Sequence, residues 1–172
     1  AIILGGSSDL TYGNYLAYEE FNKSVNIVSA DSSFRLKHKG IAPEKQHYIP
    51  RIILRNNNLL FNYSVIGYQT YLVSPFDVDL ASKLYFDAYR LGIVQANIAE
   101  MEPVLRDADI FSFNIGSVQS AHSPAHKKAS PNGFTSKEAC QLARYSGLGD
   151  RLSSFGFYDF IPSIDSNYQS SA

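Results

Sequence analysis

The sequence predicts an α/β fold of three layers, in which a mostly parallel, doubly wound sheet lies between two layers of helices. Short segments that are almost continuously apolar alternate with segments whose apolar residues recur at helical spacing. Strands that are apolar on both faces are typical of a parallel sheet covered by helices on both sides. A length of 172 residues is enough for one domain with a sizeable core, so we predict a single domain over residues 1–172.

The predicted strands are apolar runs that stop at a glycine or at a polar segment. They are Ile2–Leu4, Val25–Val28, Leu59–Ile66, Ile110–Asn114 and Leu152–Tyr158. Because a strand pattern begins almost at the first residue, we expect a partial domain that lacks its opening strands. The polar segment after Asp165 leaves open whether more chain follows.

The predicted helices lie between these strands and are marked by capping residues, helical spacing or both. They are a helix from Asp9 to about Phe21, a short one over 48–54, one from Asp77 to Leu91 stopped by Gly92, one over 98–106, and one from the capping box Thr135–Glu138 through Tyr145. Pro103 argues against the middle of the fourth helix. Residues 29–46 and 116–134 are predicted to be loops.

Composition excludes several classes of function. The formal net charge is −1, which gives no electrostatic basis for binding nucleic acid or an anionic membrane surface. No apolar run is long enough to span a bilayer. Cys140 is the only cysteine, which excludes an internal disulfide and fits a reducing, cytoplasmic setting. Its apolar helix position predicts a core residue rather than a reactive thiol.

Ligands of open parallel sheets bind at the carboxyl ends of the strands, so the segments after each strand are the candidate site. Four of them carry polar motifs: Gly5-Gly6-Ser7-Ser8, Asp31-Ser32-Ser33-Phe34-Arg35, Ser112-Phe113-Asn114-Ile115-Gly116 and Tyr158-Asp159-Phe160-Ile161-Pro162. In this order they resemble the motifs of the ureohydrolase family, which comprises arginases, agmatinases and formimidoylglutamases. The segments between them, such as 62–70, 106–109 and 129–134, resemble a bacterial arginase or formimidoylglutamase-like branch, and the resemblance covers essentially the whole chain.

The resemblance implies a two-manganese site. Family members hold both ions with two His and four Asp, and the ions activate a hydroxide that cleaves a C–N bond of a guanidino or formimino substrate. The six ligand positions carry over to Ser8, Asp31, Ser33, Arg35, Asn114 and Gly116, and the substrate-facing Glu carries over to Asp159. Only Asp31 keeps a residue type that the family uses as a ligand, and Arg35 places a fixed cation where a metal would lie.

Two main functions follow from these substitutions. The first is a non-catalytic module for binding or for homo-oligomer formation, without manganese or another cofactor. The alternative is a hydrolase of guanidino or formimino compounds that keeps some metal chemistry through Asp31 and Asp159. A third hypothesis is a sensor that still binds a small guanidino or formimino ligand.

Other polar residues offer weaker sites. Gly5-Gly6 is predicted to be a tight turn, since a dinucleotide-binding pattern is absent. The serines lack a partner His that would make a nucleophile. His122 and His126 are separated by Pro124 and are predicted to lie in a solvated loop rather than to share a helical face as metal ligands.

Overall fold

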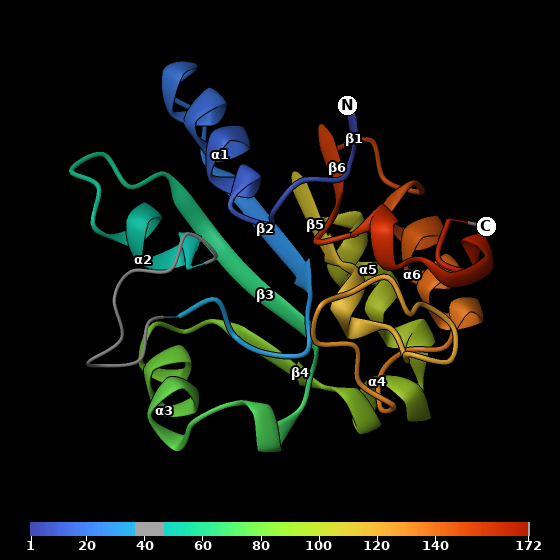
Figure 1. Ribbon diagram of the computed structural model, residues 1–172. Coiled ribbons are helices and arrows are strands. Elements are labelled where there is room, and N and C mark those ends of the chain that lie inside the picture. The colour runs from blue at the N-terminus through green and yellow to red at the C-terminus, as the bar shows by residue number, and fades with distance from the viewer. Residues whose placement is uncertain (37–46, 172) are drawn as a thin grey trace.

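The computed structural model describes residues 1–36 and 47–171, and they form a parallel sheet with helices on both faces (Figure 1). The sheet has six strands in the order β1-β6-β5-β2-β3-β4, and all neighbouring strands are parallel. The strands are β1 (Ile2–Leu4), β2 (Val25–Ala30), β3 (Leu60–Tyr68), β4 (Asp87–Arg90), β5 (Ile110–Asn114) and β6 (Ser154–Tyr158). The predicted fold class is therefore confirmed.

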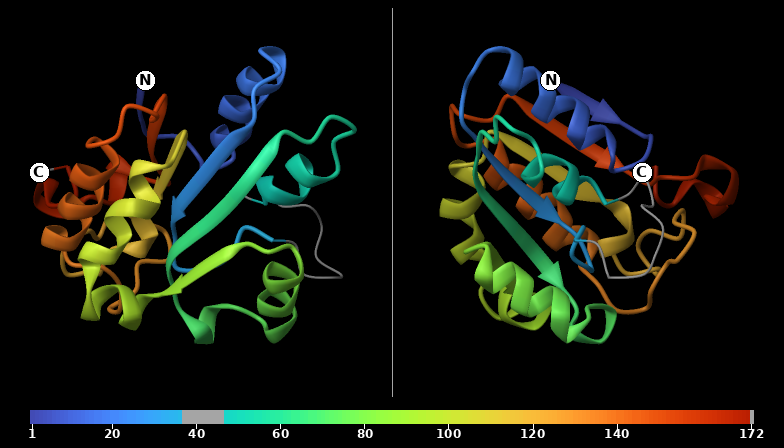
Figure 2. Two further views of the ribbon diagram at one scale, coloured as in Figure 1. Left: turned by 180° about the vertical axis from the view of Figure 1, so that it is seen from behind. Right: turned by 90° about the vertical axis from the view of Figure 1, so that its left-hand side faces the viewer.

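The helices lie in two layers on opposite faces of the twisted sheet (Figure 2). They are α1 (Leu10–Glu20), α2 (Tyr48–Ile53), α3 (Pro75–Lys83), α4 (Leu91–Ala96), α5 (Met101–Arg106) and α6 (Ser136–Ser146). Short 3-10 helices occupy Thr70–Leu72, Ile98–Glu100, Ile115–Ser117, Pro162–Ile164 and Ser166–Tyr168. Within residues 1–36 and 47–171, no helix is long and apolar enough to cross a membrane.

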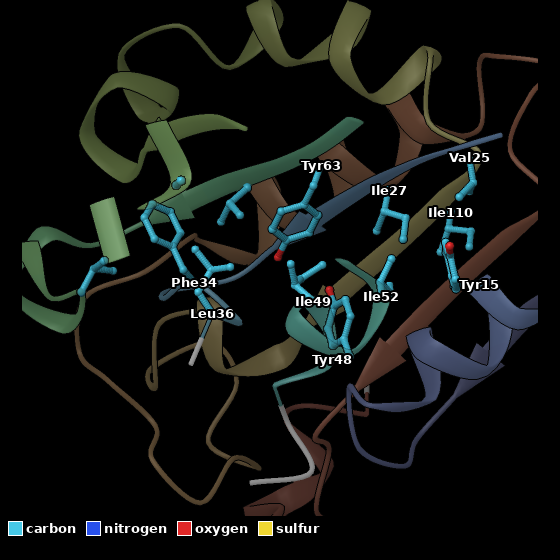
Figure 3. Close-up of a cluster of buried hydrophobic side chains, with 13 residues drawn as sticks. Tyr15, Val25, Ile27, Phe34, Leu36, Tyr48, Ile49, Ile52, Tyr63 and Ile110 are labelled. Atoms are coloured by element: carbon cyan, nitrogen blue, oxygen red, sulfur yellow. The ribbon is translucent and has the colours of Figure 1, made fainter. Parts of the chain in front are cut away.

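Alternation of side chains along the strands divides the core between the two faces. On one face, Ile27 of β2 and Tyr63 of β3 pack with side chains of α1, α2 and α3. Figure 3 shows this cluster, in which Tyr15, Tyr48, Ile49 and Ile52 come from the helices. On the other face, Val28 and Ala30 of β2 pack with α4, α5 and α6. Both faces of the central strands are thus buried, which explains their continuous apolar runs.

The prediction of one helix from Asp77 to Leu91 is wrong. The structure divides this segment into α3, strand β4 and the start of α4. Helix α3 is capped by Ser74, whose hydroxyl accepts from the Asp77 backbone N–H, with Pro75 in the first turn. Tyr85, at a φ of 57°, breaks the helical path, and β4 then pairs with β3. The helical spacing over 78–91 does not give one helix, because the pairing of 87–90 with β3 outweighs local propensity.

Smaller differences concern the ends of other helices. Asp9 is the N-cap of α1 but forms no side-chain cap hydrogen bond. Pro103 lies in the first turn of α5, where proline is tolerated, because residues 98–100 form a separate 3-10 helix. The capping box of Thr135 and Glu138 is confirmed.

Cys140 is exposed on α6, so the prediction that it belongs to the core is wrong. Of the predicted loop at 29–46, residues 37–46 lie outside the described residues.

Candidate functional site

Four strand ends meet at one edge of the sheet, because all the strands are parallel and β1, β6, β5 and β2 are neighbours. Ser8 follows β1, Asp31 follows β2, Asn114 ends β5 and Asp159 follows β6. Backbone hydrogen bonds fasten these ends together. The Gly5 N–H donates to the Phe157 carbonyl at 2.8 Å, and the Asp159 N–H donates to the Gly6 carbonyl at 2.8 Å. The sheet topology therefore gathers residues that are far apart in the sequence.

Local backbone conformation shapes two of these ends. Gly5 and Gly6 have φ angles of 88° and 79°, which favour glycine, and they form the tight turn after β1. Asp159 has a φ of 65°, in the left-handed region that Asp tolerates better than most residues. This turn ends β6 and leaves the Asp159 carboxylate among Ser8, Asn114 and Arg35. Strained backbone at a cluster of polar groups is frequent in functional sites.

The Arg35 guanidinium forms a buried ion pair at the centre of the cluster. Its Nε and Nη2 atoms lie 2.6 and 2.5 Å from Asp31 Oδ2. Its Nη2 atom also lies 3.7 Å from Asp159 Oδ2. Asp31 is 3% exposed and Arg35 is 8% exposed, so water screens this pair weakly. One guanidinium is therefore shared by two carboxylates.

Hydrogen bonds to neutral groups complete the cluster. Asp159 Oδ2 accepts from the Asn114 amide at 2.6 Å and from the Ser8 hydroxyl at 3.2 Å. Asn114 Oδ1 accepts from the Gly116 backbone N–H at 2.7 Å. Asp31 Oδ1 accepts from the Ser33 backbone N–H at 3.2 Å. All seven residues selected by sequence are thus linked in one network around Arg35.

Burial and charge shift the pKa values of the ion pair. Desolvation raises the pKa of the Asp31 carboxyl, because it outweighs the opposing attraction of Arg35, and the neighbouring Asp159 carboxylate adds to the rise. For Arg35, desolvation lowers the pKa, but the attraction of Asp31 and Asp159 is larger in sum and the net pKa is raised. The guanidinium therefore remains charged, and it offsets part of the negative charge of the two carboxylates.

A cavity of about 260 Å³ opens beside the network. Its lining residues are Asp31, Ser32, Ser33, Arg35, Leu72, Asn114, Gly116, His126, Lys128, Ser130 and Asp159. Another cavity, of about 310 Å³, lies at the amino ends of β2, β3 and β4. There Asp87 is hydrogen-bonded to Asn62 and Ser64. We regard the cavity at the carboxyl edge as the candidate site because charged groups from separate strands converge on it.

His126 lines this cavity, although the sequence pattern predicted only that it lies in a solvated loop. A Cβ atom at Gly116 would lie 2.6 Å from His126 Cε1 and 2.8 Å from both ring nitrogens. The imidazole thus occupies the space that any side chain at position 116 would need. The C-terminal segment holds the loop, since the Ala125 carbonyl accepts from the Ile161 N–H and the Ala125 N–H donates to the Ser170 hydroxyl.

Solved structures share the fold of this chain over almost its whole length. Formiminoglutamase of Trypanosoma cruzi with Mn²⁺ aligns with a TM-score of 0.85 and 16% identity, covering 98% of this chain and 59% of that chain. Formimidoylglutamase of Bacillus subtilis aligns with a TM-score of 0.84 and 16% identity, covering 99% and 56%. The chain has the fold of the arginase superfamily. This likeness confirms the fold that the sequence motifs implied.

The chain spans less than two thirds of the length of these structures. A third neighbour with the arginase fold is an arginase-like protein from Trypanosoma brucei, with a TM-score of 0.70 and 14% identity, covering 95% of this chain and 51% of that one. It is a quadruple mutant in which three Ser and one Arg were replaced by three Asp and one His. No protein-family model and no curated protein matches the sequence.

The residues of this arginase-fold site do not fit a pair of manganese ions. Among the described residues, no three His, Cys, Asp or Glu side chains are grouped so that they could hold a metal ion. Asp31 and Asp159 could each offer an oxygen, but the Arg35 guanidinium contacts both carboxylates. At an effective dielectric constant of about 20, unit charges ~4 Å apart interact by about 4 kcal/mol, and a divalent ion beside Arg35 would be repelled about twice as strongly. The donors among the described residues therefore do not match a two-manganese site.

Proposed function

We propose that this arginase-fold domain is non-catalytic, and that the Arg35 guanidinium takes the electrostatic place of the metal ions. The observation that supports this proposal is the buried contact of one guanidinium with both Asp31 and Asp159. Two carboxylates at one sheet edge need a compensating cation, since an unpaired buried carboxylate is costly. Arg35 supplies that cation as part of the chain itself, so the fold needs no metal ion at this position.

The remaining polar groups support a binding or structural role rather than hydrolysis. Metal-assisted hydrolysis of a C–N bond needs a water molecule made nucleophilic near neutral pH. In this network, Asp159 Oδ2 already accepts from Ser8 and Asn114 and contacts Arg35. Asp31 Oδ2 is bound to Arg35 through two nitrogens. The Oδ2 atom of each carboxylate is therefore already engaged by the guanidinium, and that of Asp159 also by two hydrogen-bond donors.

The test is the metal content of the purified chain after growth with excess Mn²⁺, measured by elemental analysis. We expect well below one equivalent, and we expect Asp31→Ala to change nothing in that value. Near-stoichiometric manganese that disappears in Asp31→Ala would contradict the proposal and support a hydrolase of guanidino or formimino compounds.

A restored variant provides a positive control for the metal measurement. The substitutions Ser8→His, Ser33→His, Arg35→Asp, Asn114→Asp and Gly116→Asp rebuild the six ligand types that the family resemblance implies. Because a side chain at 116 would meet the His126 ring, the variant also needs His126→Ala. We expect this six-fold variant to retain more Mn²⁺ than the wild-type chain and more than the version that keeps His126.

A further inference from the structure

The rim of the carboxyl-edge cavity consists largely of hydrogen-bond donors. Lys128 and Ser130 lie on it together with His126, on the loop that follows β5, and Ser32 and Ser33 line it from the segment after β2. The acidic groups of the cavity, Asp31 and Asp159, both contact Arg35. A ligand at the rim therefore meets hydrogen-bond donors and the Lys128 ammonium, whereas the two carboxylates of the cavity are engaged by Arg35.

The tautomer of His126 follows from its contacts. The Lys128 backbone N–H donates to His126 Nδ1 at 3.1 Å, so Nδ1 acts as an acceptor and carries no proton. The ring proton then lies on Nε2, which becomes a donor. The ring is only partly buried, and His126 is one of the residues that line the cavity.

Lys128 and Arg35 add positively charged N–H groups that the ion pairs of the described residues do not use. Within residues 1–36 and 47–171, no carboxylate forms an ion pair with the Lys128 ammonium. The contacts of Arg35 with Asp31 and Asp159 use Nε and Nη2, and Nη1 is the nitrogen not used in them. The Ser130 hydroxyl accepts from the Asn132 N–H, which leaves its own proton for donation.

We infer that this rim binds the oxyanion group of a small molecule, a carboxylate or a phosphate, through Lys128, His126 and Ser130. Cationic and N–H donors matched to oxygen acceptors form the stronger class of hydrogen bonds. A cationic ligand is disfavoured here, because it would have to displace Arg35 from both carboxylates. The volume of about 260 Å³ lies just below the range of roughly 300–1,000 Å³ that is usual for small-molecule sites, which suits a small ligand.

This inference concerns the same cavity as the proposed function and relies on it only for the position of Arg35. The probes are inorganic phosphate and acetate, titrated at constant ionic strength and followed by the imidazole NMR signals of His126. We expect saturable shifts with at least one of the two probes. The difference between the probes tells whether the site prefers a tetrahedral or a planar oxyanion.

The matched variants are Lys128→Gln and Lys127→Gln. Both remove one exposed lysine from the same loop, but only Lys128 lines the cavity. We expect Lys128→Gln to weaken binding roughly three- to tenfold, as the loss of a charged hydrogen bond does, and Lys127→Gln to leave it within about twofold. His126→Gln should weaken binding at least as much as Lys128→Gln.

Two results would overturn the inference. One is the absence of saturable shifts with both probes, each titrated up to roughly 50 mM, a level that would fill most of a site with a Kd of about 10 mM. The other is an equal loss in Lys127→Gln and Lys128→Gln, which would show non-specific attraction to the loop. Neither result bears on the metal content, so failure of this inference is distinguishable from failure of the proposed function.

Discussion

Replacing Arg35 by Met tests whether the buried ion pair stabilises the fold. The change keeps an apolar stem of similar length but removes the contacts of 2.5 and 2.6 Å with Asp31 and the contact of 3.7 Å with Asp159. Breaking a buried pair on one side costs about 3–5 kcal/mol, because a carboxylate remains buried without its partner. For a chain of this size that corresponds to a fall in Tm of about 6–20 °C.

The loss should depend on pH. Desolvation already raises the pKa of Asp31, and removing Arg35 removes the main opposing attraction, so the pKa rises further. A raised folded-state pKa contributes stability that is fully present below the unfolded value, near 3.9, and is lost as pH rises through the folded value. The difference between wild type and Arg35→Met should therefore be largest at pH 7 to 8 and should shrink toward pH 4.

Urea unfolding followed by circular dichroism at several pH values measures this difference. Arg55→Met is the matched control, since Arg55 contacts Glu19 at a similar 2.6 Å but near the surface, where we expect a much smaller loss. Asp31→Asn combined with Arg35→Met should recover part of the stability, because the uncompensated charge is gone. A loss in Arg35→Met no larger than in Arg55→Met, with no dependence on pH, would refute the reasoning.

Two further predictions concern the core. Gly67→Ala should destabilise the fold by about 2–5 kcal/mol in urea unfolding, because the residue has a φ of 91° and a Cβ atom would lie 2.4 Å from Phe134; Gly13→Ala, in the open middle of α1, should be neutral or stabilising. Burial raises the pKa of Tyr63 well above its usual value, and nearby Tyr48 adds to this. Its contribution is therefore fully present below about pH 10 and falls as pH rises further, so urea midpoints should drop above that pH and drop less steeply in Tyr63→Phe. A steeper drop in Tyr63→Phe, or an equal loss in the two glycine variants, would contradict these assignments.

Much of the fold could be predicted from the sequence because its strands are short apolar runs that are buried on both faces. Residues 110–114 are all buried, and their apolar pattern correctly predicts a strand. Strand β4 escapes such a prediction because Asp87, Ala88 and Arg90 are exposed, so no apolar run marks them. Its strand character comes from pairing with β3, which is a long-range contact.

The site could be predicted in part, for a similar reason. The expectation that Asp31, Arg35, Asn114 and Asp159 converge rests on the strand ends of a parallel sheet, and the structure places them together. The sequence pattern around His126 predicts only a solvated loop. The approach of His126 to Gly116 depends on how the loop folds back, which a local pattern does not encode.

The sequence alone determined where the strands end along the chain and which polar residues follow each strand, since these depend on local apolar runs and on residue identity. The proposal that Arg35 and Gly116 occupy substituted ligand positions rests on residue identity and motif order. Only the tertiary structure decided that one guanidinium serves both Asp31 and Asp159, and that His126 fills the space left by Gly116. These contacts join residues on separate elements, and their distances are set by sheet twist and loop packing rather than by spacing in the chain.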